Sequence, residues 1–352
     1  MLDKRVAPLT DEAAKFNNEQ WQTMLRQRPD LKYCQFPAET EIVIGGTLAQ
    51  ATITMIDRPN KGLHANMQSD SAAFDAWALA LLFHCGAQEV HIGLGPGVRV
   101  DCESLRHYER FLYRLRRFAD LFRDRVKITN WPAAGSKALD PQIKRLLNRP
   151  NSRKNPPQTE RDERMKAASA PAPSESDLEK ALEVSGAFRE HFHLTKVMRQ
   201  WPTGLFNGSV GEGHQVFTGG KSGIDLIGIQ DDTLVLFELK KAGNRKAGAV
   251  SELLFYASVM RDALGDSPTF EFESKKAIKN CEITPKDITS CSKIRGVLLA
   301  PGFHPFFEEA SIFKELNGAM KQLYVDRPVQ FETARIVDYP QDEWGDFKFS
   351  NG

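Results

Sequence analysis

Residues 223–241 read GIDLIGIQDDTLVLFELKK, and their apolar runs predict two short strands joined by a polar turn. Each run contains one acid in a sequence otherwise suited to a buried strand: Asp225 lies in the first and Glu238 in the second. Lys240 follows Glu238 after a single leucine. A carboxylate inside a sheet is costly unless it has a partner, so these three residues need a physical explanation.

The length of the turn predicts that the two acids face each other. If residues 231–232 form a two-residue hairpin turn, outward pairing places Asp225 directly opposite Glu238, and a four-residue loop with the same centre gives the same register. Opposite residues of an antiparallel pair share one face of the sheet, with Cβ atoms roughly 4.5–5.5 Å apart. Lys240 points to the same face as Glu238 because side chains alternate along a strand. The spacing therefore predicts a cluster of two carboxylates and one amine.

Three arrangements would relieve the repulsion between the acids. The acids share a proton, or Lys240 forms a structural salt bridge with one of them, or a divalent cation lies between them beside Lys240. Mg²⁺ prefers oxygen ligands and is commonly held by one or two carboxylates, water and a substrate phosphate. Such a cation lowers the pKa of bound water and neutralises charge on a phosphate.

The same residues carry a resemblance to a known family. Asp225 followed by Glu238-Leu239-Lys240 resembles the active-site motif of the PD-(D/E)XK, or restriction-endonuclease-like, nuclease superfamily. Glu252 and Tyr256, four residues apart in the predicted helix that follows, resemble the QxxxY motif of its exonuclease branch. Two departures are that the first motif lacks its proline and that Glu252 stands where the branch usually has glutamine. The resemblance covers roughly residues 176–300.

The resemblance implies a role for each motif residue. Asp225, Glu238 and Lys240 would be the catalytic residues. Asp225, Glu238 and the main-chain carbonyl of Leu239 would hold Mg²⁺ or Mn²⁺, and Lys240 would position or activate the attacking water.

A further acidic ligand and a substrate-binding set are also implied. Family members often carry a glutamate on the helix before the sheet, and Glu179 and Glu183 are the candidates, one helical turn apart. Glu179 is favoured over Glu183, but only slightly, because Ser176 as an N-cap offers Glu179 an ordinary alternative role in completing a capping box. The residues expected to contact substrate are Lys241, Arg245, Glu252 and Tyr256. A solvated surface turn is an equal alternative for the basic loop after Lys240.

The order of predicted elements favours an α+β fold with a mixed sheet flanked by helices. In the C-terminal part we expect helices over 176–192, 248–264 and 304–318, and strands over 214–219, 223–229, 233–240, 293–300, 322–325 and 329–337. The resemblance implies an αβββαβ core of the restriction-endonuclease-like type.

Composition divides the chain into three parts. Residues 148–176 are rich in Pro, Ser, Ala and charge and predict a flexible linker. It would join a separate α+β domain over 1–147, with a role in recognition or regulation, to the nuclease-like domain over 177–352. In the first domain we expect strands over 41–46, 51–57 and 89–95 and helices over 71–86 and 103–125. Arginines on the last helix predict either a solvated face or a contact with a phosphate backbone.

The composition of all 352 residues is that of a soluble globular protein, with 41% hydrophobic and 26% charged residues and a net charge of +1. Five scattered cysteines, no signal-peptide pattern and no long apolar run predict a cytoplasmic protein with reduced thiols and no membrane partner.

We therefore expect a Mg²⁺- or Mn²⁺-dependent nuclease that binds nucleic acid, with DNA favoured over RNA, in prokaryotic restriction or antiviral defence, or in repair. The alternative is an inactive nuclease-fold module that binds nucleic acid or a protein. A protein partner or a second copy of the chain, bound through the N-terminal domain, remains open.

Overall fold

The computed structural model describes residues 15–56, 67, 69–95, 105–130, 137–150, 156–217, 223–244, 246–265, 268–273, 281–308, 311–340 and 346–351. Its α-helices are α1 (Asn18–Arg26), α2 (Phe74–Phe83), α3 (Leu105–Leu121), α4 (Gln158–Ala168), α5 (Glu175–Val184), α6 (Gly186–His191), α7 (Gly248–Asp262), α8 (Pro285–Thr289), α9 (Pro305–Glu308) and α10 (Ser311–Leu323). Short 3₁₀ helices are η1 (Pro29–Leu31), η2 (Asp70–Ala72) and η3 (Lys137–Leu139).

The strands form three sheets. A first sheet has the order β1 (Ile42–Gly46), β2 (Gln50–Met55), β3 (Glu89–Leu94), β4 (Val126–Thr129). The largest sheet has the order β13 (Lys348–Asn351), β12 (Val329–Asp338), β11 (Lys293–Ala300), β9 (Thr233–Leu239), β8 (Gly223–Gln230), β6 (Lys196–Pro202). A small sheet has the order β10 (Phe270–Phe272), β5 (Arg145–Leu147), β7 (Leu205–Asn207).

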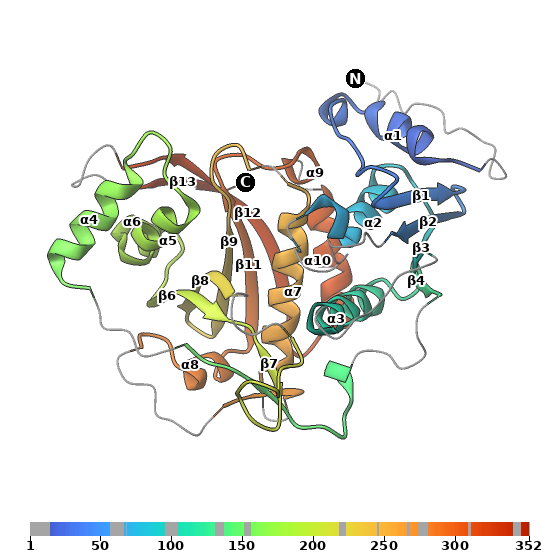
Figure 1. Cartoon of the computed structure of the whole chain (residues 1–352). Helices are drawn as coiled ribbons and strands as arrows, with labels where there is room; N and C mark the ends of the chain where they lie inside the picture. Colours follow the sequence, from blue (N-terminus) through green and yellow to red (C-terminus); the bar gives the residue numbers. More distant parts are fainter. Residues whose placement is uncertain are drawn as a thin grey trace.

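The molecule is layered, as Figure 1 shows. The first sheet packs against α2 and α3, which in turn pack against α7 and α10. α7 and α10 cover one face of the large sheet, and α5 lies against β6 and β8 on its other side, with α4 beside α5. The class predicted from sequence, α+β with a mixed sheet flanked by helices, is confirmed.

In the large sheet, β8 is antiparallel to both of its neighbours, β6 and β9, and β11 runs parallel to β9 after the crossover through α7. The predicted hairpin forms as expected: Gln230 pairs with Thr233, and the pairing runs outward to Leu226 opposite Phe237. Asp231 adopts φ 51°, the left-handed conformation that a tight hairpin turn requires. The strand predicted over 293–300 matches β11 at both ends.

The predicted strand over 214–219 is wrong. Gln215 makes only an isolated bridge with Phe206, and residues 218–219 lie outside the described part of the chain. β6 instead supplies the first antiparallel strand. Its sequence KVMRQWP lacks clean alternation of apolar and polar residues, which is why the pattern missed it.

A second predicted strand, over 322–325, is also wrong. Residues 322–323 are the last residues of α10. Leu316, Met320 and Tyr324 are buried at four-residue steps, so the helical period prevails over the β propensity of this short run. The helix predicted over 304–318 corresponds to α9 and α10.

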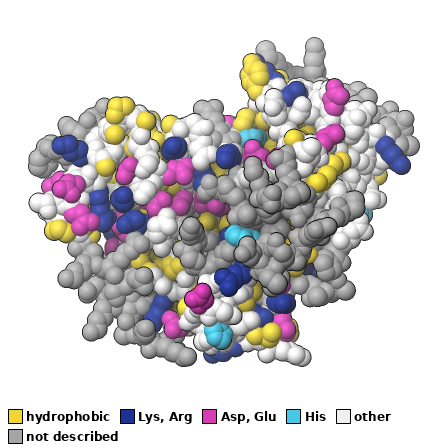
Figure 2. All heavy atoms as spheres, in the orientation of Figure 1, with side chains coloured by type: hydrophobic (Ala, Val, Ile, Leu, Met, Phe, Trp, Pro, Cys, Tyr) yellow, Lys and Arg dark blue, Asp and Glu magenta, His cyan; other side chains and the backbone are white. Residues whose placement is uncertain are grey.

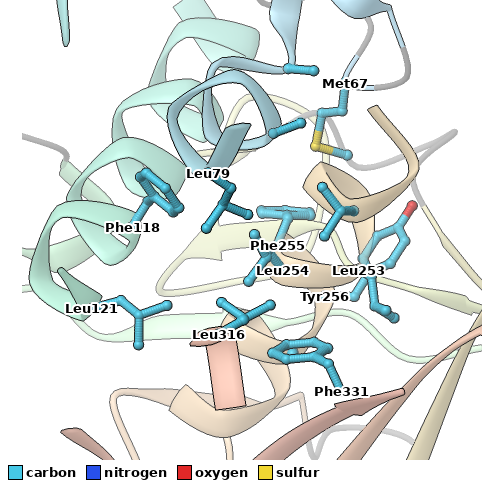
Figure 3. Close-up of a cluster of buried hydrophobic side chains, with 14 of the residues drawn as sticks. Met67, Leu79, Phe118, Leu121, Leu253, Leu254, Phe255, Tyr256, Leu316 and Phe331 are labelled. Atoms are coloured by element: carbon cyan, nitrogen blue, oxygen red, sulfur yellow. The ribbon is translucent and has the colours of Figure 1, made fainter. Parts of the chain in front are cut away.

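One hydrophobic core joins the two halves of the chain. α2 is apolar on all sides and buried from Phe74 to Leu82, as expected of a helix enclosed between two layers. Its core cluster includes residues from the first sheet, from α3 and α7, and from the large sheet. Figure 3 shows side chains from these elements converging: Leu79, Phe118, Leu121, Leu253, Leu254, Phe255, Leu316 and Phe331. The region before residue 148 thus shares its core with the region after 176.

The segment expected as a flexible linker contains helix α4, of 11 residues. Met165 and Ala168 on α4 are buried in a second cluster, with Leu178 and Leu182 of α5. Arg164 also forms an ion pair with Glu183 across the two helices, at 2.8 Å. Residues 158–168 are therefore not part of a flexible linker as expected. Met165, Ala168 and Arg164 hold α4 against α5, although most of the rest of α4 is polar.

Two half-buried histidines at the junction between α2 and α9 lead to a prediction about pH. Burial, with Arg28 nearby, lowers the pKa of His84 to about 4, and burial, with His84 nearby, lowers the pKa of His304 to about 4. Below about pH 6.5 these histidines are therefore protonated in the unfolded chain but stay neutral in the folded chain. The free energy of unfolding consequently falls as the pH drops from about 6.5 towards 4. We expect a loss on the order of 1–2 kcal/mol per histidine between about pH 7.5 and pH 5, measured by urea unfolding.

The matched variant combines His84→Asn with His304→Asn. The side-chain oxygen of each asparagine would lie near the place of the histidine Nδ1, which accepts from Arg28 in the case of His84 and from the Phe306 N–H in the case of His304. It should lose less stability over the same interval. An equal loss in the variant and the wild type would contradict this assignment.

Candidate active site

The β8–β9 hairpin brings Asp225 and Glu238 to one end of the central strands. The Leu239 N–H donates to Asp225 Oδ2 at 2.9 Å, which anchors the first acid on the second strand. Asp225 is half-buried, and Glu238 is 1% exposed. Immediately after β9, the Lys240 N–H donates to the Leu299 carbonyl at 2.9 Å, which holds the lysine backbone against β11.

The Lys240 side chain joins the hairpin to helix α7. Its Nζ donates to Glu238 Oε1 and, at 3.3 Å, to Glu252 Oε2. All three side chains are buried. Of the sequence-derived alternatives, the structural salt bridge forms with Glu238 and Glu252 rather than with Asp225. The packing of α7 on β9 and β11 positions Glu252 for this contact.

The acids outnumber the cation at this site. Burial raises the pKa of Asp225 to about 8; Lys240 opposes this rise, and Glu179 and Glu252 add to it. Burial, with Asp225 and Glu252, raises the pKa of Glu238 well above its usual value. Burial alone would lower the pKa of Lys240, but Glu238, Glu252 and Asp225 raise it instead. The site therefore has a net affinity for positive charge.

The donor atoms suit a hard divalent cation. Glu238 Oε2 is buried and has no hydrogen-bond partner among the described residues, although a buried carboxylate oxygen normally has one. A cation beside Asp225 and Glu238 would satisfy it. Within the described ranges, no group of three or more His, Cys, Asp or Glu side chains is arranged to hold a metal ion. Mg²⁺ tolerates such a site because backbone carbonyls, water and substrate phosphate complete its shell.

Of the two helix glutamates, Glu179 is the one near the cluster. It is 7% exposed, and its charge contributes to the raised pKa of Asp225. Glu183 instead binds the Arg199 backbone N–H and side chain, at 3.1 and 3.2 Å, and also pairs with Arg164. These contacts give Glu183 a structural role.

The expected capping role for Glu179 is wrong. Ser174, not Ser176, is the N-cap of α5, and its capping box is completed by Asp177. Glu179 is therefore an interior residue of the helix and is available to the site. The error arose because two serines two residues apart offer the same local signal.

The residues expected to contact substrate occupy different environments. Glu252 and Tyr256 are buried in α7, and burial, with Glu252 and Glu238, raises the pKa of Tyr256 well above its usual value. Lys241 is exposed at the rim, and its N–H donates to Glu175 at 3.2 Å. Arg245 lies outside the described residues. Leu239 lies between the two catalytic candidates, and the role of its carbonyl stays a prediction.

Two residues of the site were not found from sequence. Gln200 on β6 donates its amide to Glu179 Oε2 at 2.6 Å. Arg110 on α3 is 5% exposed, and its pKa is lowered to about 10 by burial and the Arg114 charge, while Tyr256 and Glu252 oppose that shift. A basic residue of the N-terminal part thus lies near the α7 side of the cluster. Gln200 had no local signal, since it sits in the missed strand. Arg110 was marked only as one of the arginines on its helix, and its closeness to α7 could not be predicted because the two elements are far apart in sequence.

The visible face of the molecule shows acids and bases gathered in one region. In Figure 2, Asp and Glu side chains cluster between the part that carries α4–α6 and the part that carries α7, with Lys and Arg side chains around them. Basic groups at the rim of an acidic centre would suit a phosphate chain that approaches a bound cation.

Replacing Lys240 tests the ion pairs directly. Lys240→Met leaves Glu238 and Glu252 buried without their cation, so in EDTA we expect a loss of about 3 kcal/mol in the free energy of unfolding. The matched control is Lys241→Met, one residue along and exposed, which should change stability by less than about 0.5 kcal/mol. Urea unfolding followed by circular dichroism gives both values. Similar values for the two variants would show that the Lys240 contacts do not stabilise the fold.

No helix in the described part of the chain is long and apolar enough to cross a membrane. Comparisons of the chain with protein-family models, with curated proteins and with solved structures find no match. The assignment of the site therefore rests on the geometry and chemistry of its own residues.

Proposed function

We propose that this protein is a Mg²⁺- or Mn²⁺-dependent nuclease that hydrolyses phosphodiester bonds, with DNA favoured over RNA as substrate. The observation that carries the proposal is the convergence of Asp225, Glu238 and Lys240, with Glu238 Oε2 buried and without a partner. An acid pair whose pKa values are raised by burial and by neighbouring carboxylates is typical of a site that binds a cation.

The element order supports the proposal. α5, β6, β8, β9, α7 and β11 come in this order along the chain as helix, three antiparallel strands, helix and parallel strand, with α6, β7, β10 and α8 between them. With those intervening elements left out, the order is compatible with the αβββαβ core that the resemblance to the PD-(D/E)XK superfamily implies. The catalytic candidates lie on the second and third strands of that unit, and Glu252 and Tyr256 lie on the crossover helix.

Each residue has a role in the proposed reaction. Asp225 and Glu238, with the Leu239 carbonyl, would hold the cation, which when bound supplies charge neutralisation for the phosphate and acidifies water. Glu238 and Glu252 hold the Lys240 ammonium in place, so that it can orient the attacking water. Lys241 at the rim would contact the phosphates of the substrate strand.

The experiment is a cleavage assay on supercoiled plasmid, linear duplex DNA, single-stranded DNA and RNA, with Mg²⁺ or Mn²⁺. We expect the wild type to cleave DNA and EDTA to abolish the activity. Asp225→Asn, Glu238→Gln and Lys240→Met should each reduce the rate at least ~100-fold. The matched control is Glu190→Gln, which removes an exposed carboxylate on α6 and should retain full activity.

The outcomes separate the candidate functions. Cleavage at equal rates by the wild type and the three site variants would overturn the catalytic assignment. Binding of DNA without cleavage under every metal condition would favour the alternative, an inactive nuclease-fold module. The proposed biological setting, restriction or antiviral defence or repair, follows only if DNA cleavage is observed.

A further inference from the structure

Gln200 has an unusual backbone conformation for a residue inside a strand. Its φ is 53°, in the left-handed region that residues other than glycine, asparagine and aspartate rarely adopt. Such strain persists only where the surrounding structure enforces it, and it clusters at functional sites. The position of Gln200 is therefore informative.

The strained residue lies opposite Asp225. On either side of it, Arg199 pairs with Leu226 and Trp201 pairs with Ile224, so the register places Gln200 across from Asp225. The ladder between β6 and β8 is interrupted at these two residues. The distortion of β6 thus coincides with the first candidate cation ligand.

The distortion also changes the direction of the side chains. In a regular strand, residues three apart point to opposite faces, yet Met198 and Trp201 belong to the same hydrophobic core cluster. The left-handed backbone of Gln200 allows this reversal of side-chain direction, and the Gln200 side chain points to α5, where it contacts Glu179. A Cβ on Gly223, which pairs with Pro202 on β6, would lie 3.3 Å from Gln200 Oε1, so this glycine leaves room for the amide in its position.

The amide of Gln200 determines where the Glu179 carboxylate lies. Gln200 Nε2 donates to Glu179 Oε2 at 2.6 Å, and both side chains are at least partly buried. Glu179 is close enough to Asp225 for their charges to interact. Burial raises the pKa of Glu179, and the hydrogen bond from Gln200 opposes this rise.

We propose that Gln200 is a positioning residue of the cation site: its strained backbone aims the amide at Glu179 and holds that carboxylate beside Asp225, where it assists cation binding. This inference rests on the cation site of the proposed function, but not on cleavage. Gln200 acts through Glu179 and touches neither substrate nor the reacting atoms.

The test measures Mn²⁺ binding to the full chain by isothermal titration calorimetry, without nucleic acid. Partners of metal ligands typically contribute 10–100-fold to affinity, so Gln200→Ala should weaken Mn²⁺ binding at least ~10-fold. Glu179→Gln should weaken it to a similar extent, and the double variant should be no weaker than the single variants, because the two residues act as one unit. Gln330→Ala, which changes an exposed side chain on β12, is the control and should bind like the wild type.

A second readout separates positioning from general stability. Gln200→Gly and Gln200→Ala both remove the amide, but glycine adopts the left-handed conformation without strain. In EDTA the glycine variant should unfold at a higher urea concentration than the alanine variant, while both show the same loss of Mn²⁺ affinity. A merely structural role for Gln200 predicts instead that affinity follows stability.

The possible results are decisive. Unchanged Mn²⁺ affinity in Gln200→Ala, additive effects in the double variant, or no Mn²⁺ binding by the wild type would overturn the inference. Mn²⁺ binding with the expected variant pattern, but without cleavage of any nucleic acid, would support the inference and reject the nuclease proposal.

Discussion

The buried Lys240 ammonium, held by Glu238 and Glu252, is the interaction on which the candidate site depends. It connects the end of the central hairpin to the crossover helix α7, and it opposes the rise that burial causes in the pKa of Glu238. A buried ion pair of this kind adds little to stability compared with apolar packing, because removing the charges from water is costly. A role in the proposed reaction would explain its presence in an otherwise apolar sheet.

Helix α7 can serve the site because layers on both sides fix it in place. Its Leu253 and Phe255 pack into the shared core, as Figure 3 shows, and Tyr256 lies at the margin of that cluster. Asp75 of α2 accepts from Ser251 of α7 and, at 3.1 Å, from Arg114 of α3. The N-terminal part thus supports the helix that presents Glu252 and Tyr256, and a change in its packing would be transmitted to Lys240.

The register of the hairpin was predictable because a two-residue turn allows only one pairing of the strands. The face of the sheet to which each side chain points was predictable because side chains alternate along a strand. β11, β12 and α7 were predictable for similar reasons of period and length. β6 was not predictable from sequence, because the left-handed backbone at Gln200 breaks the alternation of inward and outward side chains on which strand prediction depends. The partners of the arginines on α3 were also hidden: Arg114 pairs with Asp75, and Arg117 with Asp262. A solvated or phosphate-binding face had been expected there.

By itself, the sequence predicted the register of the hairpin, which the structure confirms out to Leu226 opposite Phe237, and the closeness of Glu238 and Lys240, since both depend only on turn length and the two-residue period of a strand. The tertiary structure alone decided the rest. It places Glu252 in contact with Lys240, and it places Glu179 rather than Glu183 near the site. It also brings Gln200 and Arg110 near the site and joins the two halves of the chain through one core. These contacts link residues far apart in sequence, and only the packing of helices on sheets decides which distant side chains meet.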